Sequence, residues 1–138
     1  GMARQLGASA TINSSEEGAA EKLMELTEGG ARSIVDFVGA EASVNFGYNL
    51  LARGGSYVIV GLFGGQISIP LPMQALLEKK LMGSYVGSLG DMAELMELVV
   101  AGKIDPVAVE TRDVSQANET LEQMKDGKLL GLVALTHN

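Results

Sequence analysis

The stretch ARGGSYVIVGLFGG, residues 52–65, decides the fold that the sequence predicts. Its middle, at 57–62, carries no charged residue, and glycine pairs stand before it at 54–55 and after it at 64–65. Apolar residues that do not alternate with polar ones are typical of a strand buried on both faces, as in a parallel sheet. We therefore expect a central strand of a parallel sheet at 56–62.

Strand and helix patterns alternate on the amino-terminal side of this strand. The β-branched run ATINSS predicts a short strand at 10–15, and Ser14 with Glu17 has the spacing of a capping box for a helix at 16–28. A second strand is expected at 31–39. The next helix is expected at 41–53, closed by the glycine pair, with three apolar residues on one face: Val44, Tyr48 and Leu51.

The same alternation continues on the carboxyl-terminal side. We expect, in order, a short helical turn into a strand that ends near Val86, a helix at 91–102 that starts at Asp91 with Glu94, a strand at 105–114, a helix capped by Ser115 and stopped by Gly127, and a last strand at 129–136. In the helix at 91–102, five apolar residues recur at helical spacing and are expected to face the core: Met92, Leu95, Met96, Val99 and Val100.

This order of elements predicts an α/β fold, with a mostly parallel sheet and helices on both of its faces. The 138 residues, 46% of them hydrophobic, are enough for one domain with a real core. In such sheets, ligands bind outside the carboxyl ends of the strands. A binding site is therefore expected where the strands end.

Composition excludes several classes of function. The net charge of −7 disfavours a nucleic-acid partner, and no apolar run approaches the length of a membrane span. The first residues lack the layout of a signal peptide, so we expect a cytoplasmic protein without a membrane partner. The chain has no cysteine, and its one histidine, His137, precedes the last residue. No metal site is expected within the chain.

Small residues gather at three expected strand ends, and we call the eight residues there the strand-end cluster: Val38, Gly39, Val60, Gly61, Leu62, Ser84, Tyr85 and Val86. Glycines at strand ends let a flat ligand approach the backbone. They also start ordinary turns, and spacing leaves both interpretations open. Asp36 and Asp91 are interpreted as solvated strand-end or capping residues rather than as an acid–base pair.

Nearly the whole chain resembles the medium-chain dehydrogenase/reductase family, in its zinc-dependent alcohol dehydrogenase branch. The resemblance lies in five stretches in family order: ARQLGASATINSSEE, SIVDFVGA, ARGGSYVIVGL, KKLMGSYVGSLGDMAELMELVVAGKI and LEQMKDGKLLGLVALT. It implies a partial Rossmann fold that lacks the first two strands. Residues 8–104 would form the second half of a nucleotide-binding domain, and 105–136 a returning strand, helix and strand, all within a single domain.

The resemblance also implies a strand order and a site. The segments 33–38, 56–61 and 81–86 should be parallel neighbours in that order, and the strand at 10–13 should pair beside 33–38 or with a partner chain. NAD or NADP would bind with Val60, Gly61 and Leu62 along the nicotinamide ring, Ser84, Tyr85 and Val86 at its carboxamide, and Val38 and Gly39 beside the ribose. A homodimer with residues 81–86 at its interface is expected as well.

Departures from the family limit what the chain does alone. The phosphate-binding G-x-G-x-x-G turn and the zinc ligands are absent, and Leu132 stands where the family commonly has an arginine for the cofactor phosphates. We expect zinc and a small alcohol or aldehyde substrate only in the complete protein, with the isolated chain inactive. The alternatives are a catalytically silent folding and association module, or a fragment of a zinc-independent quinone reductase.

Overall fold

The computed structural model describes residues 2–105, 107–129 and 131–137. The chain forms two compact units, one up to Val86 and the other from Gly87 on, and each is described by itself. The predicted division near residue 104 within one domain stays a prediction. None of the helices in the described ranges is long and apolar enough to cross a membrane.

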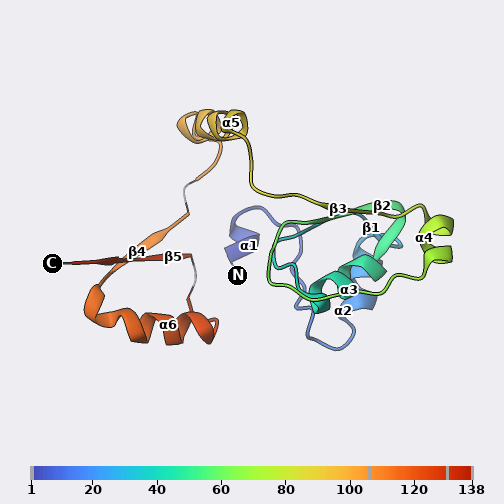
Figure 1. The fold of residues 1–138 in the computed structure, drawn as a ribbon, viewed down its shortest axis with the longest axis horizontal. Helices are drawn as coiled ribbons and strands as arrows, with labels where there is room; N and C mark the ends of the chain where they lie inside the picture. The colour runs from blue at the N-terminus through green and yellow to red at the C-terminus, as the bar shows by residue number, and fades with distance from the viewer. Residues whose placement is uncertain (1, 106, 130, 138) are drawn as a thin grey trace. The chain divides into compact units, whose positions relative to one another are not determined.

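The first unit is built on a three-stranded parallel sheet (Figure 1). Its strands are β1 (Ala31–Asp36), β2 (Leu51–Ile59) and β3 (Lys80–Gly83), in the order β1-β2-β3. Val58 of β2 lies opposite Val35 of β1 and Met82 of β3. The expected neighbours, their order and their parallel direction are confirmed, and the apolar strand of the opening stretch lies in the centre. The predicted α/β fold with a parallel sheet is confirmed.

Four helices belong to this unit: α1 (Met2–Gln5), α2 (Ala19–Leu26), α3 (Glu41–Asn49) and α4 (Leu71–Leu77). The helix predicted at 41–53 was too long, because α3 ends at Asn49 and β2 already starts at Leu51. Between the pairs Ala31–Leu51 and Ser33–Ser56 the register shifts, so β2 carries extra residues there. The glycine pair at 54–55 lies inside this irregularity rather than after a helix, since glycines also serve bulged strands.

The expected pairing of residues 10–13 beside β1 was wrong, because these residues are irregular within the chain, and their pairing with a partner chain stays a prediction. A strand persists only where a neighbour pairs with it, and in the described part of the chain β1 pairs with β2 alone. The capping box of Ser14 and Glu17 does not form either. Asn13 makes a turn instead, in which its side-chain oxygen accepts the N–H of Ser15 at 3.1 Å, and α2 starts later, after Gly18 at φ 77°.

The core of the first unit lies between α3 and the sheet. Four residues form the buried cluster: Val44, Tyr48, Leu51 and Tyr57. The apolar face predicted for a single helix thus does reach the core, although Leu51 reaches it from the strand. Tyr57 is the most deeply buried of these four, with 1% of its surface exposed. Its hydroxyl group donates to the side chain of Asp36, the last residue of β1.

The second unit contains α5 (Leu89–Val100), β4 (Val109–Asp113), the 3₁₀ turn η1 (Val114–Gln116), α6 (Ala117–Lys125) and β5 (Leu132–Thr136). The strands β4 and β5 are parallel, with Thr111 opposite Ala134. The expected order of helix, strand, helix and strand is confirmed. Two starts differ: Ser88 caps α5 in a box with Asp91, and Asp113 rather than Ser115 caps η1, which precedes α6.

The apolar stripe of α5 does not face a core. Met92 is 55% exposed and Met96 is 50% exposed, so the core of the second unit does not include them, contrary to expectation. Leu95 and Val100 are exposed as well, and Val99 is half-buried. A stripe at helical spacing becomes buried only where another element packs on it, and within the described part of the second unit no element covers Met92 or Met96.

Candidate functional site

Backbone hydrogen bonds bring the three predicted strand ends together. The carbonyl oxygen of Asp36, at the end of β1, accepts the N–H groups of Val60 and Gly61, each at 2.9 Å. The carbonyl oxygen of Ile59, at the end of β2, accepts the N–H of Ser84 at 2.9 Å. The backbone turns of the strand-end cluster are therefore neighbours at one edge of the sheet.

The turn after β1 and the turn after β2 stay paired beyond the strands. Phe63 donates its N–H to the carbonyl of Val38 at 3.1 Å, and Gly64 donates to that of Gly39 at 3.0 Å. Ala40 and Gly64 then form an isolated parallel bridge. The two turns thus run alongside each other as an extension of the sheet.

Gly39 and Gly61 are required by this pairing. Gly39 has φ 65°, which favours glycine, and a Cβ added to it would collide with the carbonyl of Gly61. A Cβ added to Gly61 would collide with the carbonyl of Val38. The sequence left open whether these glycines serve a ligand or a turn, and the structure shows that backbone contact between the two turns already demands them.

The side chains of the cluster point away from the core. Leu62, Tyr85 and Val86 are each about three-quarters exposed, at 77%, 74% and 77%, and Val38 is exposed too. Val86 also has φ 46°, a strained value for a β-branched residue. The edge therefore combines a fixed backbone with apolar side chains that are open to solvent.

Sequence reasoning missed the buried group beneath this edge, which is Asp36. Its Oδ1 accepts the N–H of Val38 at 2.8 Å and of Gly39 at 3.1 Å, and its Oδ2 accepts the hydroxyls of Ser43 at 2.8 Å and Tyr57 at 2.9 Å. Only 6% of Asp36 is exposed, so it is not the solvated residue that was expected. The sequence does offer a signal for this role: an aspartate often accepts the N–H groups of the residues two and three positions after it in a turn.

The hydrogen bonds decide the charge of Asp36. Burial raises the pKa of this carboxyl, but the bonds from Gly39, Ser43, Val38 and Tyr57 outweigh burial, so its pKa lies below the ordinary value. Burial, with the adjacent carboxylate, raises the pKa of the Tyr57 hydroxyl. At neutral pH, Asp36 is therefore an anion and Tyr57 a neutral donor to it.

A small pocket adjoins the edge between the start of α3 and the loop after β2. Its volume is about 200 Å³. Nine residues line it: Gly39, Ala40, Glu41, Val44, Ile59, Gly64, Gly65, Gln66 and Ile67. The pocket thus shares Gly39 with the strand-end cluster, and Glu41 and Gln66 are its polar side chains.

Lys79 ties α4 and β3 to α3. Its Nζ donates to the carbonyl of Tyr48 near the end of α3 at 2.9 Å and lies 5.0 Å from the centre of the Tyr48 ring. The Tyr48 hydroxyl donates to the side-chain oxygen of Gln74, and the side-chain nitrogen of Gln74 donates to the carbonyl of Lys79. A cation at the carboxyl end of a helix is favourable, so Lys79, Tyr48 and Gln74 are explained as support for the fold. Burial lowers the pKa of Lys79.

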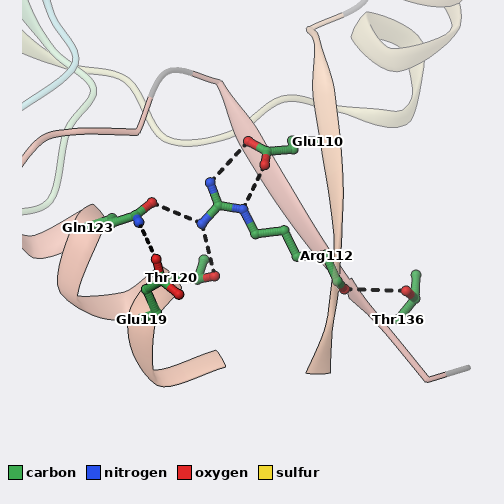
Figure 2. Close-up of polar contacts among 6 residues, drawn as sticks. All are labelled: Glu110, Arg112, Glu119, Thr120, Gln123 and Thr136. Carbon is green, nitrogen blue, oxygen red and sulfur yellow. Dashed lines mark hydrogen bonds and ion pairs between the residues drawn. The ribbon is translucent and has the colours of Figure 1, made fainter. Parts of the chain in front are cut away.

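Arg112 on β4 is the centre of a second polar group, in the second unit (Figure 2). It donates through Nε and Nη2 to both oxygens of Glu110, at 2.7 and 3.2 Å, and through Nη1 to Thr120 at 3.2 Å and Gln123 at 2.9 Å. These four bonds use most of the five donors of a guanidinium. Arg112 is thus a clamp between β4 and α6 rather than a free anion-binding group.

Metal binding has no support in the described part of the chain. It contains no group of three histidine, cysteine, aspartate or glutamate residues that could hold a metal ion. With no cysteine in the sequence, thiolate ligands are excluded. The side chains of the described residues therefore do not fit a zinc site.

Comparison with known proteins gives a consistent match. Residues 1–101 match the model of a zinc-binding dehydrogenase family. An NAD-dependent alcohol dehydrogenase of Sulfurisphaera tokodaii is 32% identical over 130 residues, which are 94% of this chain and 38% of that protein. An alcohol dehydrogenase of Geobacillus stearothermophilus is 31% identical over 134 residues, 97% of this chain and 39% of the relative.

Solved structures agree with the sequence matches. The alcohol dehydrogenase of Aeropyrum pernix superposes with a TM-score of 0.86 at 33% identity, covering 97% of this chain and 38% of that one. The D-arabinose dehydrogenase of Sulfolobus solfataricus gives a TM-score of 0.70 at 33% identity, over 80% and 34% of the two chains. The chain thus spans less than half the length of the relatives that it matches.

Proposed function

The chain belongs to the zinc-binding dehydrogenase family, and we propose that it supplies the nicotinamide half of the cofactor site of an NAD(P)-dependent alcohol dehydrogenase. The reaction of the complete protein would be reversible hydride transfer between an alcohol and the nicotinamide ring. Alcohol dehydrogenases among the relatives support this class of reaction. A small alcohol or aldehyde would be the substrate.

The observation that carries the proposal is the meeting of three strand ends at one edge. Asp36 joins the turn after β1 to the turn after β2, and Ile59 joins β2 to the residues after β3. In open parallel sheets, this edge is where ligands bind. The exposed side chains of Leu62, Tyr85 and Val86 offer an apolar surface for the flat ring of a nicotinamide.

The proposed roles within the strand-end cluster follow its order. Val60, Gly61 and Leu62 would lie along the ring, Ser84, Tyr85 and Val86 at the carboxamide, and Val38 and Gly39 beside the ribose. The N–H groups of Val60, Gly61 and Ser84 are already donated within the protein. The carboxamide would therefore pair with other backbone groups of the cluster, most directly with its carbonyl oxygens, which accept from an amide N–H₂.

This chain's own contribution is binding and orientation. The sequence has no G-x-G-x-x-G turn, and its described side chains do not gather into a zinc site. In the proposal, the pyrophosphate turn and the zinc belong to other parts of the complete protein, where zinc would act as the Lewis acid on the alcohol oxygen. The isolated chain would orient a nicotinamide without turning over an alcohol.

The proposal is tested by titrating the ¹⁵N-labelled chain with each half of the cofactor. Reduced nicotinamide mononucleotide should shift the amide signals of residues 38–39, 60–62 and 84–86, whereas adenosine monophosphate should leave them in place. If neither compound shifts these signals, the chain is the silent folding and association module. If the adenosine compound alone shifts them, the assignment of the nicotinamide half is wrong.

We also propose a homodimer and a cytoplasmic location. In the three-stranded sheet β3 is an edge strand, and the sequence after Lys80 up to residue 86 has no charge or proline to blunt that edge. Pairing of two such edges about a two-fold axis would join two sheets into one.

The absence of cysteine from the 138 residues supports the cytoplasm, since disulfides are typical of exported proteins.

A further inference from the structure

We propose that Asp36 is a positioning residue for the nicotinamide site: it fixes the turn after β1 against the turn after β2 and so sets the spacing of the edge that receives the ring. The inference rests on the function proposed above. In this inference the buried carboxylate of Asp36 does not touch the ligand. It controls the position of the two backbone turns that do.

One residue, Asp36, binds both the turn after β1 and the turn after β2. The carboxylate oxygen Oδ1 of Asp36 accepts the N–H groups of Val38 and Gly39, and its main-chain carbonyl accepts those of Val60 and Gly61. The side-chain oxygen and the carbonyl oxygen are separated by only a few covalent bonds. A change in the side chain of Asp36 therefore acts directly on the spacing between the two turns.

Two hydroxyl groups hold the other oxygen of the Asp36 carboxylate. Its Oδ2 accepts the hydroxyls of Ser43 and Tyr57, while Ser43 also accepts the N–H of Ala40 at 3.1 Å. Ala40 lines the small pocket beside the edge. The hydroxyl groups thus connect the orientation of Asp36 to the start of α3 and to the wall of that pocket.

The Tyr57 ring is packed too closely to move. Tyr57 is almost fully buried, and a Cβ added to Gly47 of α3 would lie 2.7 Å from its ring carbon Cε2. Because the ring is packed this closely, its hydroxyl cannot follow a shifted carboxylate. The Tyr57 hydroxyl is a fixed donor to the side chain of Asp36, and the turns after β1 and β2 are fixed as well. Together they leave Asp36 a single orientation.

The experiment compares four forms of the full chain: wild type, Asp36→Ala, Asp36→Asn and Asp91→Asn. The amide of Asp36→Asn still offers an Oδ1 to Val38 and Gly39, so it should rescue part of the effect. Asp91 is the matched control, since it also accepts a backbone N–H and a hydroxyl, both from Ser88, but in the second unit. Affinity for reduced nicotinamide mononucleotide is measured at a temperature where every form is folded.

The expected result is a loss of affinity of about ten-fold or more in Asp36→Ala, a smaller loss in Asp36→Asn and no change in Asp91→Asn. A role in stability alone would lower the unfolding temperature and leave the affinity of the folded form unchanged. Equal affinity in wild type and Asp36→Ala would overturn the inference.

A second measurement keeps the two proposals apart. If the wild type does not bind the mononucleotide, the proposed function fails, and amide hydrogen exchange then decides whether Asp36 positions the turns. Faster exchange at Val38, Gly39, Val60 and Gly61 in Asp36→Ala, with unchanged exchange in β3, supports positioning. Unchanged exchange at these four residues overturns it. Should Asp36→Ala not fold, Tyr57→Phe, which removes only the hydroxyl below Asp36, takes its place in both measurements, with the same outcomes.

Discussion

Gly39 and Gly61 lie so close together that neither has room for a β-carbon. A Cβ on Gly39 would collide with the carbonyl group of Gly61, and a Cβ on Gly61 with that of Val38. Gly39 also has a positive φ of 65°. The contact joins the turns after β1 and β2, so the geometry of the candidate site is part of the fold and forms without a ligand.

Gly61→Ala should therefore destabilise the chain by about 1–3 kcal/mol, because the two turns must separate to accept the methyl group. Gly83→Ala is the control, since a Cβ at Gly83 has no neighbour within 4 Å among the described residues and its φ is not positive. Urea unfolding measures both free energies. Equal stabilities of the two variants would show that the turns are not in contact in solution.

Asp36 should make the stability depend on pH in acid. Its pKa in the folded chain lies below the ordinary value of 3.8, chiefly because its four hydrogen bonds outweigh the effect of burial. The carboxylate therefore contributes stability above this ordinary pKa, which the unfolded chain has, and the contribution is lost as the pH falls through the folded pKa.

The check is the urea midpoint of the wild type and of Asp36→Asn between about pH 6 and pH 2. The wild type should be more stable at the upper end, and the difference should shrink as the pH falls below 4. The other carboxylates with a lowered pKa, such as Asp91, are present in both proteins and cancel. A difference that stays constant over the whole range would contradict an ionised Asp36.

The sequence predicted the framework of the first unit and missed its details for physical reasons. The unbroken apolar run that begins at Tyr57 indicates a buried parallel strand, and the order β1-β2-β3 was implied by the family resemblance and is confirmed. The glycine pair at 54–55 resembles the end of a helix, yet it lies in a strand whose register shifts, because local pattern does not encode pairing partners. Residues 10–13 do not pair beside β1 for the same reason.

Burial was harder to predict than secondary structure. Met92 and Met96 have the spacing of core residues, but helical spacing does not reveal whether another element covers the stripe. For Asp36 the error was the opposite one: it was expected to be solvated and is buried. A charged residue next to a turn is ordinarily solvated. Its burial depends on Tyr57 and Ser43, which stand 21 and 7 residues away in the sequence.

In the second unit, Arg112→Lys should loosen α6 from β4. Lysine offers a single ammonium group and cannot reproduce the fork that reaches both oxygens of Glu110 together with Thr120 and Gln123 (Figure 2). Amide hydrogen exchange in α6 should become faster. Lys128→Ala, which removes an exposed ion pair to Asp126 at 2.7 Å, is the control and should leave exchange in α6 unchanged.

The proposed homodimer predicts that the assembly depends on β3. Light scattering of the chain at micromolar concentration should give the mass of two chains, and Gly83→Pro should reduce it to one. Because Ser84 donates its N–H to β2, the N–H of Gly83 points to the open side of β3, where proline prevents pairing. Leu71→Pro, at the exposed start of α4, is a control outside the edge. A monomer in the wild type would contradict the proposed interface.

The most direct measurement of the central claim is the set of nuclear Overhauser contacts between the nicotinamide protons of bound NADH and the methyl groups of the chain. We expect contacts from the ring to the methyl groups of Leu62 and Val86, with the ribose protons nearest Val38. The claim would be contradicted if NADH binds but its nicotinamide protons contact only methyl groups outside the strand-end cluster, such as those of Leu95 or Val100 on α5.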